Sequence, residues 1–308
     1  MSPTRPIDGL LVVDKPPQWT SHDVVARVRR ITGTRRIGHT GTLDPMATGV
    51  LVLCLGRATR LAEYVTGQPK TYLAEITLGT ATDTYDAEGT TVFTGEVPSL
   101  DFAAVDQALD AFRGTFLQFP PVYSALKREG QPLYKRARRG EAVETEARPV
   151  HVYDLKLLAY ADGALQALVR CSAGTYVRSI AHDLGQTLGC GAHLSGLRRT
   201  AVGRFRIEEA VTIEALEARG YGWQDLLLPM DDAVRHLPIV TVPEAQARGL
   251  LHGQSIPEPL ATVADPHDRA QLFRAVDAAG RLLAIVRFDD LQNAWRPLKV
   301  LADPAAVD

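Results

Sequence analysis

The apolar residues of the chain fall into short runs bounded by turn residues. The run from Gly9 to Asp14 ends at Lys15, Pro16 and Pro17, which predicts a buried strand terminated by prolines. A second apolar run from Val50 to Leu55 predicts another strand. From Lys70 to Leu78 apolar and polar residues alternate, and this period of two predicts a strand with one buried face, formed by Tyr72, Ala74, Ile76 and Leu78.

Helical periodicity appears between these runs. We expect a helix from Ser21, as its N-cap, to about Ile31, with an apolar stripe of Val24, Val25, Val28 and Ile31. A short helix is expected near 57–65, and another from Ser99 or Asp101 to about Arg113. The stretch "SAGTYVRSIAHDLGQTLG" predicts a loop entering a helix that stops at Gly189.

Two alternating segments, 151–160 and 164–171, surround an Ala-Asp-Gly turn and predict a hairpin. Strands and hairpins mixed with helices indicate an α+β fold, with a mixed, largely antiparallel central sheet flanked by helices. After about residue 237 the pattern changes to a strand (239–242), a helix beginning at Pro243 and a hairpin (272–288). We therefore expect a catalytic domain over 1–236 and a small β-rich domain over 237–308.

Composition narrows the class of protein. The chain has 308 residues, of which 45% are hydrophobic and 23% charged, as in an ordinary globular protein. We find neither a signal-peptide core nor an apolar run near the 20 residues that span a bilayer, so a cytoplasmic protein without membrane contact is expected. The three cysteines form no C-x-x-C pair and are interpreted as small buried hydrophobes. Nucleotide-loop, zinc and serine-hydrolase motifs are absent from the sequence, and we expect no cofactor and no metal.

The net charge of −2 conceals strong local segregation. Residues 24–43 hold five arginines and no acid, and residues 127–139 hold six cations against Glu129 alone. The second stretch lies in a long polar segment, about 119–149, which predicts a surface excursion. Solvated basic faces and nucleic-acid contacts both fit these stretches.

One acid has an unusual setting. Asp44, in "GHTGTLDPMATGVL", precedes Pro45, which favours an extended conformation and a stiff turn. Four small residues nearby offer little obstruction to an approaching ligand: Gly38, Gly41, Ala47 and Gly49. From these residues alone, Asp44 is either a turn acid that bonds its own backbone or an exposed nucleophile.

The same stretch resembles the catalytic-aspartate motif of the tRNA pseudouridine synthase B (TruB) family. Four further blocks are similar in the same order: "GLLVVDKPPQWTSHDVVARVRRI", "PKTYLAEITLGTATDTYDAEG", "FPPVYSALKREGQPLYKRARRG", and "CSAGTYVRSIAHDLG" followed by "HLSGLRRTAVG". The resemblance covers roughly 9–231. Beyond Pro238 the layout resembles the family's C-terminal PUA domain, although "LKVLADP" departs from the usual ending.

The resemblance implies a pseudouridine synthase fold and isomerisation of uridine 55, in the TΨC arm of tRNA, to pseudouridine by base flipping. It assigns Asp44 as nucleophile and Arg178 as its paired arginine. Tyr72 would stack on the target base, Tyr176 and Leu197 would line the pocket, and His39 would occupy the space that the base leaves.

The resemblance also makes the basic segment an RNA-gripping thumb. Its RNA-backbone contacts would be Lys127, Lys135, Arg136, Arg138 and Arg139, and Lys15 is assigned the same role. The expected partner is tRNA, bound by a monomer with no obligate protein partner. Two alternatives remain: a non-catalytic tRNA-binding or RNA-folding protein, and a guide-RNA-dependent pseudouridine synthase relative.

Overall fold

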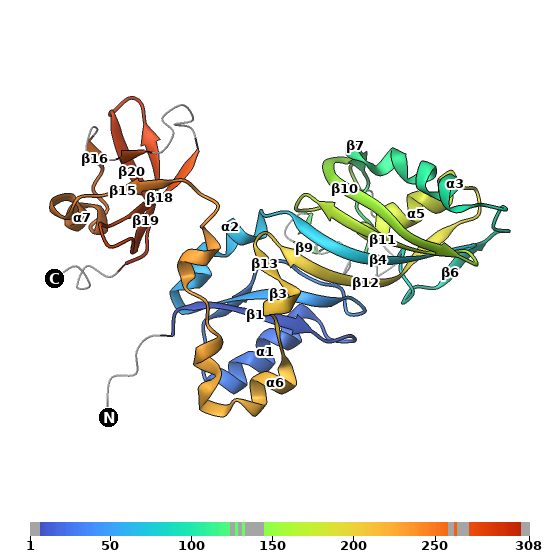
Figure 1. The fold of residues 1–308 in the computed structure, drawn as a ribbon, viewed down its shortest axis with the longest axis horizontal. Coiled ribbons are helices and arrows are strands. Elements are labelled where there is room, and N and C mark those ends of the chain that lie inside the picture. Colours follow the sequence, from blue (N-terminus) through green and yellow to red (C-terminus); the bar gives the residue numbers. More distant parts are fainter. Residues whose placement is uncertain are drawn as a thin grey trace. The chain divides into compact units, whose positions relative to one another are not determined.

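The computed structural model describes residues 7–123, 127–128, 131–132, 145–257, 262–263 and 271–302. Its main feature is a 10-stranded mixed sheet with the order β14-β1-β3-β12-β4-β11-β10-β7, in which β2 pairs with β3 and β13 with β12 (Figure 1). The strands are β1 (Gly9–Lys15), β2 (Ile37–His39), β3 (Thr48–Leu55), β4 (Lys70–Leu78), β7 (Gly114–Gln118), β10 (Arg148–Ala161), β11 (Ala164–Cys171), β12 (Ala192–Val202), β13 (Phe205–Arg206) and β14 (Val211–Thr212).

Helices and shorter elements complete this part of the chain. The helices are α1 (Ser21–Thr32), α2 (Ala62–Thr66), α3 (Phe102–Ala108), α5 (Val177–Thr187) and α6 (Ile213–Ala218). The 3-10 turns are η1 (Gly56–Leu61), η2 (Leu109–Phe112), η3 (Ile207–Glu209), η4 (Gly220–Leu226) and η5 (Met230–Ala233). Two small hairpins pair β5 (Thr80–Thr82) with β6 (Thr91–Thr94), and β8 (Lys127–Arg128) with β9 (Gln131–Pro132).

The strand directions confirm the α+β class. β12 is antiparallel to β4 and parallel to β3, and β11 is antiparallel to both β4 and β10. Side chains of α3 and α5 pack on one face of these strands, where Val105 and Ile180 join Ala74 and Val169 in the core. The alternation predicted for β4 is confirmed, because Tyr72, Ala74, Ile76 and Leu78 are all buried.

One predicted helix boundary is wrong by a residue. The N-cap of α1 is Thr20, whose Oγ1 accepts a hydrogen bond from the Asp23 amide while the Asp23 carboxylate bonds back to Thr20. This capping box satisfies the first turn, so Ser21 is left for another contact. The buried Cys54, Cys171 and Cys190 confirm the interpretation of the cysteines as hydrophobic core residues.

The C-terminal region is β-rich, as predicted. Its sheet has the order β16-β20-β19-β18-β15-β17. The elements are β15 (Ile239–Thr241), α7 (Glu244–Leu251), β16 (Ile256–Pro257), β17 (Thr262–Val263), β18 (Leu272–Val276), β19 (Leu282–Asp289) and β20 (Ala294–Val300). Trp295 fills the core between Phe273 and Phe288, with edge-to-face ring contacts.

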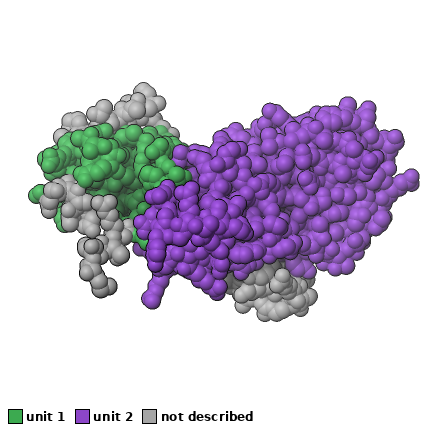
Figure 2. Space-filling model, turned by 60° about the horizontal axis from the view of Figure 1, so that its bottom comes forward, with its two compact units in different colours: residues 1–10, 54–64, 227–308 green, residues 11–53, 65–226 purple. Residues whose placement is uncertain are grey.

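Contacts divide the chain into two compact units, which are coloured separately in Figure 2. One unit comprises residues 11–53 and 65–226, and the other comprises residues 1–10, 54–64 and 227–308. The second unit thus includes η1 as well as the C-terminal sheet, and Arg60 donates to the Val300 carbonyl at 2.5 Å within it. A domain boundary at 236/237 stays a prediction. Among the described residues, no helix combines the length and apolar character needed to cross a bilayer.

Candidate active site

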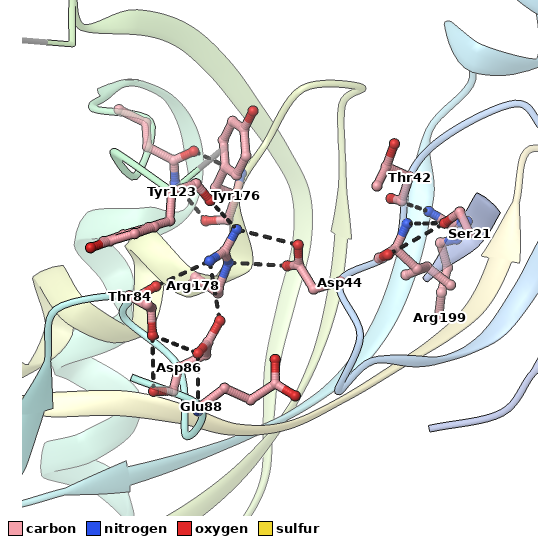
Figure 3. Close-up of polar contacts among 12 residues, drawn as sticks. Ser21, Thr42, Asp44, Thr84, Asp86, Glu88, Tyr123, Tyr176, Arg178 and Arg199 are labelled. Carbon is pink, nitrogen blue, oxygen red and sulfur yellow. Dashed lines mark hydrogen bonds and ion pairs between the residues drawn. The ribbon is translucent and has the colours of Figure 1, made fainter. Parts of the chain in front are cut away.

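Asp44 and Arg178 form an ion pair within the unit that comprises residues 11–53 and 65–226 (Figure 3). Arg178 Nη2 donates to Asp44 Oδ1 at 3.3 Å, and Nε lies 3.0 Å from Oδ2. The Arg178 side chain is only 7% exposed, whereas the Asp44 side chain is 36% exposed. The acid therefore presents its carboxylate to a ligand while a buried cation holds it from behind.

The same guanidinium binds a second acid that the sequence did not single out. Arg178 Nη1 donates to Asp86 Oδ2 at 3.1 Å, and Asp86 is buried. Asp86 Oδ1 also accepts from Thr84 Oγ1 and from the Glu88 amide. The sequence analysis assigned no function to Asp86, which lies in the connection between β5 and β6.

Two backbone carbonyls complete the surroundings of Arg178. Nη1 donates to Thr84 O at 3.1 Å, and Nη2 donates to Tyr123 O at 3.0 Å. Figure 3 shows Arg178 at the centre of this group, between Asp44 and Asp86. Because the guanidinium has five donors in a rigid plane, contacts on several sides fix its orientation. The network therefore fixes the arginine before any ligand arrives.

The loop that carries Asp44 is held at nearly every residue. Arg199 donates to the carbonyls of Gly41 and Thr42, at 3.1 and 3.4 Å. Ser21 Oγ accepts from the Leu43 amide at 2.9 Å and donates to the Leu43 carbonyl at 3.3 Å. The Pro45 carbonyl accepts from the Gln18 amide at 2.8 Å. Such anchoring pre-organises a reactive side chain, because its backbone has few alternative conformations.

Two of the four small residues in this region do not clear space for a ligand. A Cβ on Gly49 would lie 2.2 Å from the Arg199 carbonyl, so this glycine permits the close approach of β3 to β12. Ala47 is fully buried in the core. Only Gly38 and Gly41 leave open or nearly open space, as the sequence analysis expected of all four.

Burial and charge oppose each other at Asp44. Desolvation raises the pKa of its carboxyl, Arg178 lowers it, and the neighbouring charge of Asp86 raises it again. The net pKa lies above the ordinary aspartate value, so the ion pair only partly offsets the desolvation. A raised pKa also makes the carboxylate a stronger base and a better nucleophile once it is ionised.

Five of the predicted residues line one pocket of about 310 Å³: Asp44, Tyr72, Tyr176, Arg178 and Leu197. Tyr72 comes from β4 and Leu197 from β12, which are neighbouring strands, and Tyr176 lies just before α5. The side chain of Gln118 holds Tyr176 in place by accepting from its amide and donating to its carbonyl, at 2.8 and 3.0 Å. The fold thus gathers residues that are separated by up to 153 positions.

Two cations of this pocket were missed by the sequence analysis. Lys70 and Arg199 line it, and both are buried. Lys70 is two residues from Tyr72 on β4, and Arg199 is two residues from Leu197 on β12. Because residues two apart on a strand share a face, this alternation could have indicated that both cations line the pocket. Burial lowers the pKa of the Lys70 ammonium to about 8, and its Nζ donates to the Gln68 carbonyl.

The Tyr72 hydroxyl remains protonated in this setting. Burial raises its pKa, and the positive charge of Arg199 opposes only part of the rise. Tyr72 therefore offers the pocket an aromatic ring and a neutral hydroxyl, not a phenolate.

His39 lies near this pocket but is not among its lining residues. It ends β2, where its Nδ1 accepts from the Gly41 amide at 3.4 Å and its ring packs edge-on against His22. Burial lowers the pKa of His39, which favours the neutral imidazole.

The predicted role of Lys15 is wrong for the structure described. Its side chain has no exposed surface, and its Nζ donates to the carbonyls of Pro16, Trp19 and Pro45, at 2.8, 2.6 and 3.1 Å. An ammonium saturated by three carbonyls has no free direction for a phosphate. Lys15 instead anchors the residue after Asp44, and burial lowers its pKa to about 8. Of the other predicted RNA-contact residues, Lys135, Arg136, Arg138 and Arg139 lie outside the described residues, and Lys127 is described only as part of the strand β8.

Family models match most of the chain. The TruB family pseudouridylate synthase N-terminal domain matches residues 29–177, and the tRNA pseudouridylate synthase B C-terminal domain matches residues 178–235. A tRNA pseudouridine synthase B from Azoarcus sp. is 42% identical over 301 residues, which cover 97% of each chain. One from Opitutus terrae is 50% identical over 218 residues, which cover 71% of this chain and 90% of the relative.

Solved structures agree on the fold. A Cbf5-Nop10-Gar1 complex contains a chain with a TM-score of 0.79 and 27% identity, covering 97% of this chain and 86% of that one. An H/ACA RNP bound to a substrate RNA containing 2′-deoxyuridine contains one with a TM-score of 0.77 and 26% identity, covering 96% and 86%.

A mixed sheet with an aspartate paired to a buried arginine at an aromatic pocket, together with these matches, defines a pseudouridine synthase, which is an isomerase. Within that class, the chain belongs to the tRNA pseudouridine synthase B family.

Proposed function

We propose that this chain converts uridine 55 in the TΨC arm of tRNA to pseudouridine, with Asp44 as the nucleophile. The observation that carries the proposal is the Asp44 carboxylate, exposed to a pocket and paired with a buried arginine. The curated relatives are named tRNA pseudouridine synthase B, which supports tRNA as the substrate.

The reaction needs few chemical groups. The bond between uracil N1 and ribose C1′ breaks, the base turns, and a new bond joins C5 to C1′. The proton on C5 leaves and N1 gains one, so atoms and electrons balance without an oxidant, a reductant or an energy source. Attack on C1′, addition to C6 and removal of the C2′ proton all require the same ionised carboxylate, which is Asp44 in each case.

The pocket residues then have complementary roles. The target base leaves the RNA stack at a cost of a few kcal/mol, and stacking on Tyr72 returns about 1–3 kcal/mol. Tyr176 and Leu197 close the walls of the pocket. His39, half-buried beside the pocket, fills the space that the base leaves in the RNA. The basic segment 127–139 and the region 237–308 bind the RNA backbone outside the pocket.

A tritium-release assay tests this function. Unmodified tRNA carrying tritium at uridine C5 is incubated with the full chain, and release is expected because forming the new bond expels that label. A matched tRNA with cytidine at position 55 should release none. Tight binding without release would indicate a non-catalytic tRNA-binding protein, and release only after addition of a second RNA would indicate a guide-dependent enzyme.

Ser21 offers a test of loop anchoring. Ser21→Ala leaves the buried Leu43 amide without its partner, which should cost about 1–3 kcal/mol of stability. Because Leu43 is adjacent to Asp44, we also expect single-turnover tritium release to slow by about 10-fold or more.

Thr20→Ala is the matched control for this change. It removes the cap of the same helix and costs about 1 kcal/mol, but among the described residues Thr20 makes no hydrogen bond to the loop that carries Asp44. Its release rate should therefore stay within about twofold of wild type. Equal rates for the two variants would contradict the anchoring role of Ser21.

A further inference from the structure

A second hollow lies in the same compact unit as the active-site pocket. It has a volume of about 250 Å³ and is lined by Gln68, Pro69, Thr71, Arg170, Gly203 and Arg206. We call it the outer-face pocket. It combines two arginines with neutral residues, and none of its lining residues is an acid.

The strand register places this pocket on the other face of the sheet from the flipped-base site. Tyr72 faces the active-site pocket, so its neighbour Thr71 faces the opposite side. Arg170 on β11 is paired directly with Thr71 on β4, so the two side chains share that outer face. Both pockets lie at the same end of the sheet, where β4 begins and β11 ends.

A single short segment separates the two pockets. Thr66 and Lys70 line the active-site pocket, whereas Gln68 and Pro69, between them in sequence, line the outer-face pocket. The segment is fixed, because Lys70 Nζ donates to Gln68 O at 2.7 Å and the Gly203 amide donates to Pro69 O at 2.8 Å. It is therefore a rigid rim with a binding hollow on each side.

The lining of the outer-face pocket carries a net positive charge from its two arginines. Within the described part of the chain, the guanidinium groups of Arg170 and Arg206 have no carboxylate partner. Glu209 accepts a hydrogen bond from the Arg206 backbone amide. Asp154 lies opposite Arg170 in the register of β10 and β11, but its carboxylate pairs with Lys156. Arg170 lies over the ring of Tyr153, 5.1 Å from its centroid, which restricts its conformations.

We propose that the outer-face pocket binds a phosphate of the RNA strand that passes from the active-site pocket over the rim at 66–70. Two arginines beside a neutral amide match the charge and bidentate geometry of a phosphate group. The inference rests on the proposed function, since it takes RNA as the substrate. Such a contact positions the RNA strand beside the reacting nucleotide without reading its sequence.

Arg170→Gln and Arg206→Gln test the site. Each is compared with Arg219→Gln, which removes an exposed positive charge that lines neither pocket. Affinity for unmodified tRNA is measured across a range of salt concentrations. Each pocket variant should flatten the log-log salt slope by about 0.7–0.9 and weaken binding several-fold. Release at saturating tRNA should stay within about twofold of wild type, because neither arginine reaches the reacting atoms.

The outcomes separate this inference from the proposed function. One outcome is that wild type releases tritium while the salt slopes of Arg170→Gln and Arg206→Gln equal that of Arg219→Gln. This result would overturn the phosphate site and leave the proposed function intact. Absence of release by wild type would overturn the function, whatever the slopes. A competition experiment with inorganic phosphate at constant ionic strength shows whether the bound phosphate belongs to RNA. If inorganic phosphate competes with tRNA for wild type but not for either pocket variant, the result supports a phosphate of the RNA. Binding of inorganic phosphate with unchanged tRNA slopes would make this a site for free phosphate and overturn the assignment.

Discussion

Asp44→Asn is expected to reduce single-turnover tritium release by at least about 10³-fold, the scale seen when a nucleophile is removed from a pre-organised site. Asparagine keeps the shape of the side chain but loses the charge that Arg178 holds at 3.0 Å. Arg178 keeps its partners Asp86, Thr84 and Tyr123, so the network that holds residue 44 from behind persists. Affinity for tRNA should therefore change by less than about fivefold, because the proposed phosphate contacts lie elsewhere.

Asp14→Asn is a matched control for Asp44→Asn. Asp14 is also an acid paired with an arginine in the same unit, at 2.7 Å from Arg198, but it does not line the active-site pocket. Its release rate should remain within about twofold of wild type. Recovery of a tenth or more of the wild-type rate by Asp44→Asn would exclude Asp44 as the nucleophile.

The strands and their faces could be predicted from local pattern. The period of two from Lys70 to Leu78 correctly gave the buried face of β4, and the same rule extends to the pocket. Tyr72 was assigned to the site by family resemblance, and alternation then places Lys70 beside it. Arg199 follows Leu197 by the same rule. The missed cations were therefore within reach of sequence reasoning.

Other parts of the site depend on tertiary contacts that local pattern does not encode. Asp44 and Arg178 are 134 residues apart, and only the tertiary packing of the β2–β3 loop and α5 brings them together. Asp86 reads as an ordinary turn acid, and its burial against Arg178 has no local signature. Ser21 has the residue type of a helix cap, but Thr20 takes that position and leaves Ser21 to hold Leu43. Lys15 resembles a surface cation until the three carbonyls around it are seen.

Arg178→Lys should reduce single-turnover release by about 10²-fold or more, with a much smaller loss of tRNA affinity. The arginine contacts two acids and two carbonyls from one rigid plane, and the compact ammonium of lysine has only three donors. Lysine at this depth therefore leaves at least one buried acid or carbonyl without a partner. Breaking a buried ion pair costs about 3–5 kcal/mol, so a lower melting temperature is also expected.

Arg198→Lys controls for the exchange of an arginine for a lysine. Arg198 lies on β12, pairs with Asp14 and has a side chain that is 40% exposed. Its rate and melting temperature should change little, because exposed ion pairs contribute at most about 1 kcal/mol.

The pH profile separates a role beside the nucleophile from simple destabilisation. With Asp44 as the proposed nucleophile, activity requires its ionised form, so the rate falls as pH drops through the Asp44 pKa. The charge of Arg178 lowers that pKa, and weaker pairing in Arg178→Lys should move the acidic limb to higher pH. The charge of Asp86 raises the same pKa, so Asp86→Asn should move the limb to lower pH.

Shifts in opposite directions indicate that both groups act on the titrating carboxylate. A loss of folding stability alone would lower the rate in both variants, but it would not move their acidic limbs in opposite directions. Limbs that coincide with wild type, measured on protein that remains folded at each pH, would show that Arg178 and Asp86 do not set the ionisation of Asp44.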